Sequence, residues 1–284
     1  MLELSLRAAS SAVSATPTEK RYLVADAITS LIPLVAPRLF RRTQHNFARA
    51  LDTDAAQPTM QRLARASIRN FGRMAVDFLW VRTLSDSEVE AATDLSDDVY
   101  LWDSLRAGRG VILVLPHLGC WDVAAARASA TGLHIAIVTE GTWAARLAAA
   151  SRSRRGISLV RRDHSLRVLL RALHTNEGVV LLSDLARPGV QTVDVPFFGQ
   201  DAPLPSGPAR LSARTGAPIV AVACVRTSTC RYRVEFRPPI WPNSINLSRD
   251  ESLHALTAPI ATEFEALIRK YPDQWYPFGK IWPV

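Results

Sequence analysis

From residue 111 onward, short runs of apolar residues alternate with stretches of helical periodicity. The first run, VILVL at 111–115, is bounded by Gly110 and Pro116, as expected of a strand buried on both faces. Such alternation predicts an α/β domain with a mostly parallel central sheet flanked by helices. The other apolar runs are at 134–138, 157–160, 179–182 and 218–225, and the helix-like stretches lie near 121–130, 142–155, 164–175 and 206–215.

Two further patterns complete this domain, which we expect to span residues 58–284. RYRVEFR at 231–237 alternates strictly between polar and apolar residues and predicts an antiparallel strand at an edge of the sheet. A last helix is expected from about Ser248 to Tyr271, because Ser248 and Glu251 have the spacing of a capping box.

Residues 1–57 are expected to form a helical, membrane-associating region. Its central part, YLVADAITSLIPLVAPRLFRR, is dense in apolar residues but is interrupted by an acid and two prolines and followed by three arginines. This pattern favours an amphipathic segment that lies among anionic headgroups, although an ordinary helix packed on the core fits it equally well. No stretch reaches the roughly 18 apolar residues of a spanning helix, which excludes a multispan transporter or channel. The interrupting and following residues are Asp26, Pro33, Pro37, Arg38, Arg41 and Arg42.

The charge and cysteine content narrow the class of protein. Lys and Arg number 34 against 26 acidic residues, for a net charge of +8, and only three of the basic residues are lysines. Arginine chelates phosphate, so the excess fits anionic lipid, a phosphorylated ligand or nucleic acid, or a bias of the genome. The three cysteines have no C-x-x-C spacing, which disfavours a disulfide scaffold or zinc ribbon and favours a reducing, cytoplasmic setting.

The chemistry-bearing motif is PHLGCWD at 116–122, directly after the first apolar run. His117 falls in the strand-to-helix turn and Asp122 in the first helical turn, so the carboxylate can reach one imidazole nitrogen. The other nitrogen is then free to take a proton from an alcohol. The helix start offers backbone N–H groups to an oxyanion, and open α/β sheets bind ligands at this edge. A structural histidine that caps the helix is the alternative. The chain has no G-x-x-x-x-G-K-[ST], G-x-S-x-G or H-E-x-x-H motif. Nucleotide binding and serine-esterase chemistry therefore lose their main support.

A second block, residues 194–222, contains a Phe-Phe-Gly turn and a Pro/Ser/Gly entry to a helix. Phe197 and Phe198 would be costly to expose, so they belong either to the core or to a lipid-contacting surface. Ser206 and Gly207 lie near the start of the next helix and could hold a phosphate there.

The two blocks GRGVILVLPHLGCWD and VPFFGQDAPLPSGPARLSARTGAPIV, in this order and separation, resemble the lysophospholipid acyltransferase superfamily. The nearer match is the branch of lipid A lauroyl/myristoyl acyltransferases and actinobacterial phosphatidylinositol mannoside acyltransferases. The first block is similar to that branch's H-x4-D/E signature and the second to its Phe-Phe-Gly and Thr-Gly-Ala-Pro block. HNFARAL at 45–51 is similar to its N-terminal Asn-x-x-x-x-Leu region, so the resemblance covers roughly residues 40–280.

The resemblance implies roles for particular residues. His117 would be the general base, Asp122 its orienting partner, and Asp184 an acid that lines the pocket. The related glycolipid enzymes carry a Glu just before that acid, where this chain has Leu182 and Ser183. Relatives contact the acyl donor or the acceptor headgroup with arginines after the second strand–helix unit, a region that here holds Arg152, Arg154 and Arg155.

A thioester donor also needs an apolar slot for its chain and a cationic mouth for its phosphates. The expected slot residues are Trp121, Phe197 and Phe198. The expected cationic residues are Arg152, Arg154, Arg155 and Arg187.

We therefore expect a peripheral enzyme on the cytoplasmic face of the bacterial plasma membrane. It would move a fatty acyl chain from acyl-CoA or acyl-carrier protein to a hydroxyl of a membrane glycolipid, of phosphatidylinositol mannoside or lipid A type. The expected partners are the anionic membrane surface, the glycolipid acceptor and the thioester co-substrate, with no nucleic acid, metal ion or further cofactor. Two alternatives remain, a non-catalytic anionic-lipid-binding protein and a metal-dependent hydrolase. The hydrolase would use His117, Asp122, Asp184 and His254 as ligands.

Overall fold

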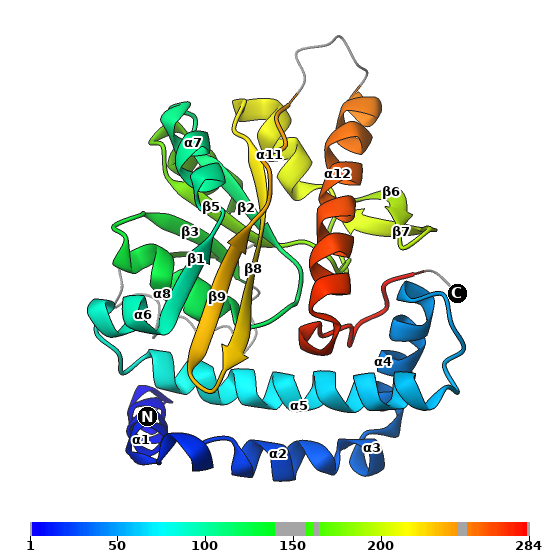
Figure 1. Ribbon diagram of the computed structural model, residues 1–284. Helices are drawn as coiled ribbons and strands as arrows, with labels where there is room; N and C mark the ends of the chain where they lie inside the picture. The colour runs from blue at the N-terminus through cyan, green and yellow to red at the C-terminus, as the bar shows by residue number, and fades with distance from the viewer. Residues whose placement is uncertain (1, 140–156, 162–164, 243–248, 283–284) are drawn as a thin grey trace.

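The computed structural model describes residues 2–139, 157–161, 165–242 and 249–282. These residues form an α/β fold around a seven-stranded sheet with the order β1-β9-β8-β2-β5-β3-β4 (Figure 1). The central strands β8, β2, β5, β3 and β4 are parallel, as the alternating pattern predicts. The strands are β1 (Thr93–Ser96), β2 (Val111–Leu115), β3 (Ile135–Thr139), β4 (Ser158–Arg161), β5 (Gly178–Leu182), β8 (Ile219–Ser228) and β9 (Arg231–Phe236).

The strand β9 is antiparallel to β8, as expected, but the prediction that it forms an edge is wrong. The short strand β1 pairs with it in parallel on its outer side, with Thr93 opposite Tyr232. The sequence of β1, TDLS, has a single large apolar residue and therefore lacks the alternation that identifies a strand.

Side chains of β2 alternate between two cores, one on each face of the sheet. Ile112 and Val114 join the core formed with α10, α11 and α12, whereas Leu113 and Leu115 join the core formed with α7 and α8. The helices of the first core are α10 (Ser165–His174), α11 (Gly207–Thr215) and α12 (Arg249–Lys270). Those of the second are α6 (Asp86–Ala92), α7 (Val99–Arg106) and α8 (Trp121–Ala130). The expected helix at 142–155 and the Ser248 cap lie outside the described residues.

A separate two-stranded hairpin, β6 (Thr192–Phe197) and β7 (Gln200–Pro205), packs against α12. Its turn is formed by Phe198 and Gly199, which both have positive φ, at 53° and 73°. Such a pair fits the right-handed twist of a two-residue hairpin, but the left-handed conformation is unusual for Phe. Glu265 of α12 accepts a hydrogen bond from the Phe198 backbone N–H at 2.6 Å and holds this turn in place.

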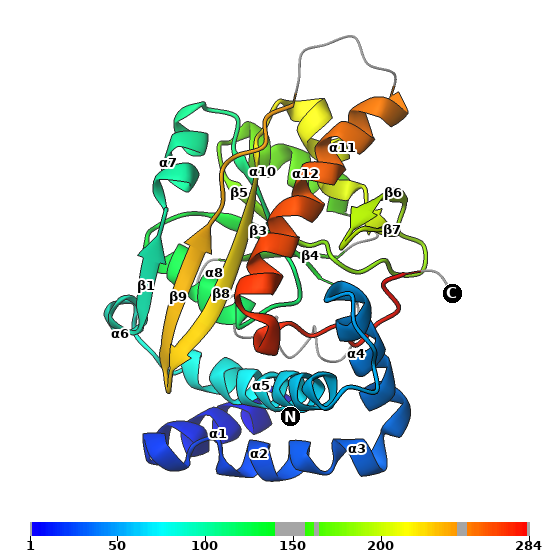
Figure 2. The same ribbon diagram turned by 45° about the vertical axis from the view of Figure 1, so that its right-hand side comes forward.

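The N-terminal residues form short helices that lie beyond the long helix α5 (Pro58–Val81). Figures 1 and 2 both show α5 between α1, α2 and α3 on one side and the sheet on the other, whereas α4 rises past the end of α5 and packs into the core. Among the described residues no single helix is long and apolar enough to span a membrane; one pair, residues 18–35 and 37–50, meets those criteria together but is bent by 93°. The elements are α1 (Leu2–Ala15), η1 (Thr18–Lys20), α2 (Leu23–Ser30), α3 (Ile32–Val35) and α4 (Pro37–Ala50).

A strip of large apolar side chains on α2 and α3 is exposed to solvent. The exposed fractions range from 53% at Leu31 to 78% at Leu34. The opposite side of α2 packs on α5, where Tyr22 and Ala25 are buried. The strip therefore lies on the side of these helices that the described residues leave uncovered. Its residues are Leu23, Val24, Ile28, Leu31, Leu34 and Val35.

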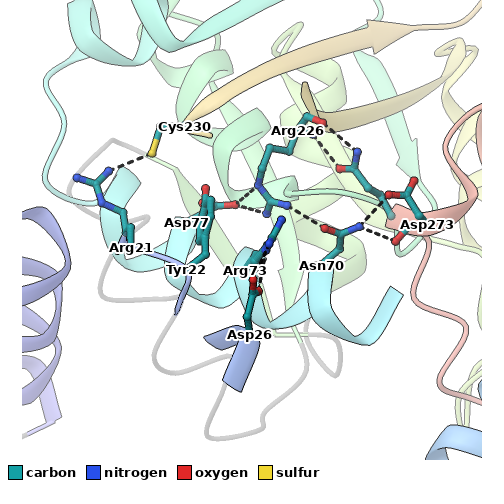
Figure 3. A network of polar contacts seen from close by, with 10 residues as sticks. Arg21, Tyr22, Asp26, Asn70, Arg73, Asp77, Arg226, Cys230 and Asp273 are labelled. Carbon is teal, nitrogen blue, oxygen red and sulfur yellow. Dashed lines mark hydrogen bonds and ion pairs between the residues drawn. The ribbon is translucent and has the colours of Figure 1, made fainter. Parts of the chain in front are cut away.

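A buried polar network fastens α2 to α5 and the sheet (Figure 3). The Tyr22 hydroxyl donates to Asp77 of α5 at 2.6 Å, and Arg226 of β8 donates to the same fully buried carboxylate. Arg73 of α5 donates twice to Asp26 of α2, at 2.8 and 2.6 Å. Burial together with the Asp77 charge raises the pKa of Tyr22 well above its usual value, so its hydroxyl keeps its proton.

Candidate active site

The parallel register of β2 and β5 brings His117 and Asp184 together. Leu115 is paired with Leu182, and each functional residue follows two positions later at the carboxyl edge of the sheet. The His117 Nδ1 lies 2.5 Å from Asp184 Oδ1, and the His117 backbone N–H donates to Oδ2 at 3.0 Å. The carboxylate is almost fully buried, whereas the imidazole is half-buried. Asp184 thus fixes both the ring and the backbone of His117.

Asp184 is held in its ionised form. Burial raises the pKa of this carboxyl, but the His117 charge, the hydrogen bonds from His117 and the Trp275 indole N–H oppose it, so that its pKa lies below the usual value. The Trp275 Nε1 donates to Oδ2 at 3.1 Å. An ionised carboxylate at Nδ1 places the imidazole proton there and leaves the lone pair on Nε2.

The Nε2 of His117 points toward a cationic, partly open region. A guanidinium nitrogen of Arg187 lies 3.5 Å from Nε2, which makes Arg187 the expected cationic residue that the structure places at the site. Trp121 packs edge to face with the imidazole, at 5.8 Å between ring centres, and in turn contacts the Tyr276 ring. A substrate that reaches Nε2 therefore meets a positive charge and an aromatic wall.

The turn after His117 depends on Gly119. Its φ is +67°, and a Cβ there would lie 1.9 Å from the Cys224 carbonyl oxygen of β8, so a larger residue is incompatible with this approach. The next residue, Cys120, donates its backbone N–H to the same carbonyl at 2.7 Å. These contacts direct the chain from the end of β2 toward β8 and begin α8 there.

Asp122 is expected to reach one imidazole nitrogen of His117, but the carboxylate at Nδ1 is that of Asp184. Asp122 is buried in the first turn of α8, and its charge acts on Cys120 and Cys224 near β8. The chain turns toward β8 after His117, whereas β5 on the opposite side of β2 delivers Asp184 directly to the ring. The carboxylate in contact with Nδ1 is therefore the one that β5 supplies.

An apolar pocket opens beside the site on the α7–α8 face of the sheet. Its lining is almost entirely apolar. Trp121 lines the pocket and also contacts His117, so the two are adjacent. The small side chains of Ala124 and Ala128 of α8 leave this space open between the helix and the sheet. The other lining residues include Leu95, Leu101, Trp102, Leu113, Leu115, Leu133, Val180, Val222, Val234 and Phe236.

Phe197 and Phe198 lie on the other face of the sheet, contrary to the expectation that they line this slot. Both are buried in the core formed with α12, and Phe198 packs against the rings of Trp275 and Trp282. The sheet separates them from the pocket, whose β2 residues belong to the opposite core. The Phe-Phe-Gly turn is therefore a structural element that supports Trp275.

The remaining expected residues divide into three groups. Ser206 is buried, and its backbone N–H and hydroxyl both donate to the Gln191 carbonyl, so it holds the entry to α11. Gly207 begins α11, and the described residues give it no further role. Arg152, Arg154 and Arg155 lie outside the described residues.

The ligand set of the hydrolase alternative is not assembled. Within the described ranges no group of three or more His, Cys, Asp or Glu side chains is placed to hold a metal ion, and His254 is exposed on α12.

The cysteines near the site are not arranged as nucleophiles. Cys120 and Cys224 are fully buried, and burial raises the pKa of both thiols, which keeps them protonated. Cys230 lies away from the site and accepts a hydrogen bond from Arg21 at 3.0 Å.

Trp275 is a residue of the site that nothing in the sequence singles out. It lies in DQWYPFG, after the last helix, where no periodicity or charge pattern singles it out. Its partner Asp184 is 91 residues away in the sequence, so only the folded structure connects them.

Comparison with known proteins identifies the family. The profile described as bacterial lipid A biosynthesis acyltransferase matches residues 6–283. A phosphatidylinositol mannoside acyltransferase from Mycolicibacterium smegmatis is 30% identical over 240 residues, covering 78% of this chain and 72% of the relative. Proteins of the same name from two strains of Mycobacterium tuberculosis are 28% identical over 260 residues, covering 84% of this chain and 75% of each relative. With its motif, its fold and a match along nearly its whole length, the chain belongs to the bacterial lipid A biosynthesis acyltransferase family.

Proposed function

We propose that this protein transfers a fatty acyl chain from a thioester, acyl-CoA or acyl-carrier protein, to a hydroxyl of a membrane glycolipid of the phosphatidylinositol mannoside type. The observation that carries the proposal is the His117–Asp184 pair, whose Nε2 faces Arg187 beside an apolar pocket. The relatives named for phosphatidylinositol mannoside support this acceptor class over lipid A.

The imidazole acts as the general base. Nε2 takes the proton of the acceptor hydroxyl as its oxygen attacks the thioester carbonyl carbon, and the Asp184 carboxylate stabilises the imidazolium that forms. When the tetrahedral intermediate collapses, the C–S bond breaks and the leaving thiolate takes the proton from Nε2. The donor is already activated as a thioester, so no acyl-enzyme is required, in keeping with the buried and protonated thiols of Cys120 and Cys224.

Two features supply positive potential to the carbonyl oxygen as it becomes an oxyanion. Arg187 lies against the nitrogen that receives the proton, and α8 begins four residues after His117, so that the positive end of its dipole follows the loop of the base. Arg187 also suits the phosphates of the donor, because a guanidinium binds phosphate through paired N–H groups.

The pocket on the α7–α8 face holds the acyl chain. Its lining is apolar apart from Arg127 and Thr131, and it begins at Trp121, next to the base. A chain placed there would have its thioester carbon near Nε2 and its methyl end between α8 and the sheet. This assignment replaces Phe197 and Phe198 as the slot residues.

The exposed strip of α2 and α3 attaches the protein peripherally to the cytoplasmic face of the membrane. Apolar side chains in the strip enter the headgroup boundary, and the exposed Arg38, Arg41 and Arg42 of α4 contact anionic lipid. The glycolipid acceptor then reaches the site without leaving the membrane surface.

The test is acyl transfer by the purified protein on vesicles. Palmitoyl-CoA and palmitoyl-carrier protein are each paired with phosphatidylinositol mannoside and with a lipid A precursor, and products are identified by mass spectrometry. We expect acylated phosphatidylinositol mannoside. Free fatty acid without acylated lipid would instead indicate a hydrolase, and vesicle binding with no product from any pair would indicate a lipid-binding protein.

A further inference from the structure

The indole of Trp275 is attached directly to the carboxylate that holds the base. Its Nε1 donates to Asp184 Oδ2 at 3.1 Å, on the same oxygen that accepts the His117 backbone N–H. The other oxygen, Oδ1, is left to the imidazole. Trp275 is fully buried, so no water competes for this bond.

The backbone around Trp275 is bonded to the loop that carries His117. The Tyr276 N–H donates to the His117 carbonyl, and the Gly119 N–H donates to the Gln274 carbonyl, both at 2.8 Å. Leu118 and Trp275 form an antiparallel bridge between these two bonds. The segment 274–276 therefore behaves as a short extra strand against the loop of the base.

The same segment is fixed from behind by α5 and β8. The Ser67 hydroxyl donates to the Trp275 carbonyl at 2.5 Å, and Gln274 exchanges hydrogen bonds with the Arg226 backbone at 2.8 and 3.0 Å. Arg226 leads into the buried network of Asp77 and Tyr22, and Asn70 joins that network to Asp273 (Figure 3).

The ring of Trp275 is enclosed by aromatic neighbours. Phe47 meets it edge to face at 5.5 Å between ring centres, and Phe198 packs at 5.9 Å. With its backbone and ring both fixed, the indole N–H has a defined direction toward Asp184.

We propose that Trp275 is a positioning residue, which keeps the Asp184 carboxylate in the orientation that holds the His117 imidazole for proton transfer. The role rests on the proposed acyl transfer for its catalytic consequence, but its structural part concerns the His117–Asp184 bond alone. Without the indole N–H, the carboxylate loses one fixed contact and can rotate about its last bond, so the ring is held less firmly.

The chain offers a matched control in Trp282. This tryptophan is also buried and packs on Phe198, but its Nε1 donates to the Phe197 carbonyl at 3.2 Å, away from Asp184. Trp275→Phe and Trp282→Phe therefore remove the same atoms from two neighbouring core positions, and only the first removes a bond to the site.

Two measurements test the role on the full-length protein. The first is the kcat and KM for transfer from palmitoyl-CoA to phosphatidylinositol mannoside, with its pH profile. We expect Trp275→Phe to lower kcat by about tenfold or more with KM within about twofold, because bonds to charged groups are the stronger ones. The acid limb of the profile, which belongs to the coupled pair, should move to lower pH, because the protonated imidazole loses part of the stabilisation that a fixed carboxylate gives it. Trp282→Phe should leave kcat and the limb unchanged.

The second measurement is the NMR signal of the His117 Nδ1 proton without substrate. We expect it to shift and to exchange faster with water in Trp275→Phe but not in Trp282→Phe. If Trp275→Phe does not fold, an analogue with sulfur in place of the indole nitrogen at position 275 keeps the shape and removes the donor.

The outcomes separate this proposal from the proposed function. Equal behaviour of the two variants in kcat, pH profile and His117 signal would overturn the positioning role. Suppose that the wild-type protein transfers no acyl group, but that the His117 signal changes in Trp275→Phe and not in Trp282→Phe. This result would overturn the proposed function and leave the positioning role supported.

Discussion

A bulky residue at Ala128 is expected to shorten the acyl chain that the enzyme prefers. Ala124 and Ala128 line the pocket from one face of α8, about 4.5 Å and about 10.5 Å along the helix from Trp121 at about 1.5 Å per residue. A chain that starts at His117 passes Trp121 first and reaches Ala128 near its end. Ala128→Leu should therefore fill the far end of the pocket and Ala124→Leu should block it closer to the base.

The size of the effect follows from the methylenes displaced. Leucine at 128 adds about three carbon atoms, so about three methylenes of a long donor lose their place. At about 0.8 kcal/mol per methylene the loss is about 2.4 kcal/mol, or about 50-fold in kcat/KM for the longest donor that fits the wild type. Donors shorter by about three carbons should keep their rate, so the optimum should move within the range from palmitate toward laurate.

The assay is kcat/KM for acyl-CoA donors of ten to eighteen carbons with one acceptor. Phe198→Leu serves as the comparison, because Phe198 is buried on the opposite face of the sheet. We expect a sharp optimum in the wild type, a shorter one in Ala128→Leu, a shorter one still in Ala124→Leu, and an unchanged one in Phe198→Leu. A flat profile, or an optimum that moves with Phe198 and not with Ala128, would refute the pocket assignment.

The site carboxylate and the exposed helices lead to three further expectations. Asp184→Asn keeps the shape of the side chain but removes its charge, so kcat in the transfer assay should fall about 100-fold or more with little change in KM. The pKa of Asp184 is lower in the folded chain, so its stabilising effect is present above about pH 4 and is lost as pH falls through the folded pKa. The urea midpoints of wild type and Asp184→Asn should therefore converge on acidification, and a constant gap would contradict this. Leu34→Asp with Val35→Asp should weaken sedimentation with anionic vesicles, whereas Leu166→Asp, at an exposed apolar residue of α10 outside the strip, should not; equal losses would argue against the strip.

Local patterns in the sequence predict most of the sheet. The run VILVL is apolar at every position because β2 is covered on both faces, and the same holds for β8 through most of its length. The β1 strand escapes detection because it is four residues long and mostly polar. The Phe-Phe-Gly turn is recognisable as a turn, but its place in the core depends on packing against α12, which no local pattern encodes.

The candidate site is also only partly predictable from local sequence patterns. His117 can be found from the sequence because it follows a buried strand directly, at the edge where α/β sheets bind ligands. Its pairing with Asp184 requires the order of strands in the sheet, in which β5 lies beside β2 although β3 and β4 come between them in the chain. The spacing of His117 and Asp122 suggests Asp122 as the partner of the imidazole, but the Gly119 turn carries α8 toward β8, and Asp184 contacts Nδ1 instead.

The residues expected to form the acyl slot lie on the opposite face of the sheet from the pocket, and local sequence patterns again do not reveal this. Phe197 and Phe198 are the conspicuous apolar pair in the sequence, whereas the pocket is made by alanines of α8, whose contribution is the space that they leave. Alanines that leave space for a ligand cannot be recognised from the sequence, because alanine is also a common residue in ordinary helices.

The membrane-associating role of residues 1–57 and the boundary at residue 58 stay predictions. The structure adds one observation to them, the exposed apolar strip on α2 and α3. Hydrogen bonds of Tyr22, Asp77 and Arg226 connect α2 to the segment 274–276 that carries Trp275. The helices proposed to contact lipid are therefore connected to the segment that contacts the His117 loop.

The most direct test of His117 as the general base is the turnover of His117→Ala at saturating palmitoyl-CoA and phosphatidylinositol mannoside, with vesicle binding measured on the same samples. A positioned general base contributes about 10²–10⁴-fold, so kcat should fall at least about 100-fold while binding to vesicles is unchanged. A His117→Ala protein that keeps more than about a tenth of the wild-type turnover would contradict the assignment.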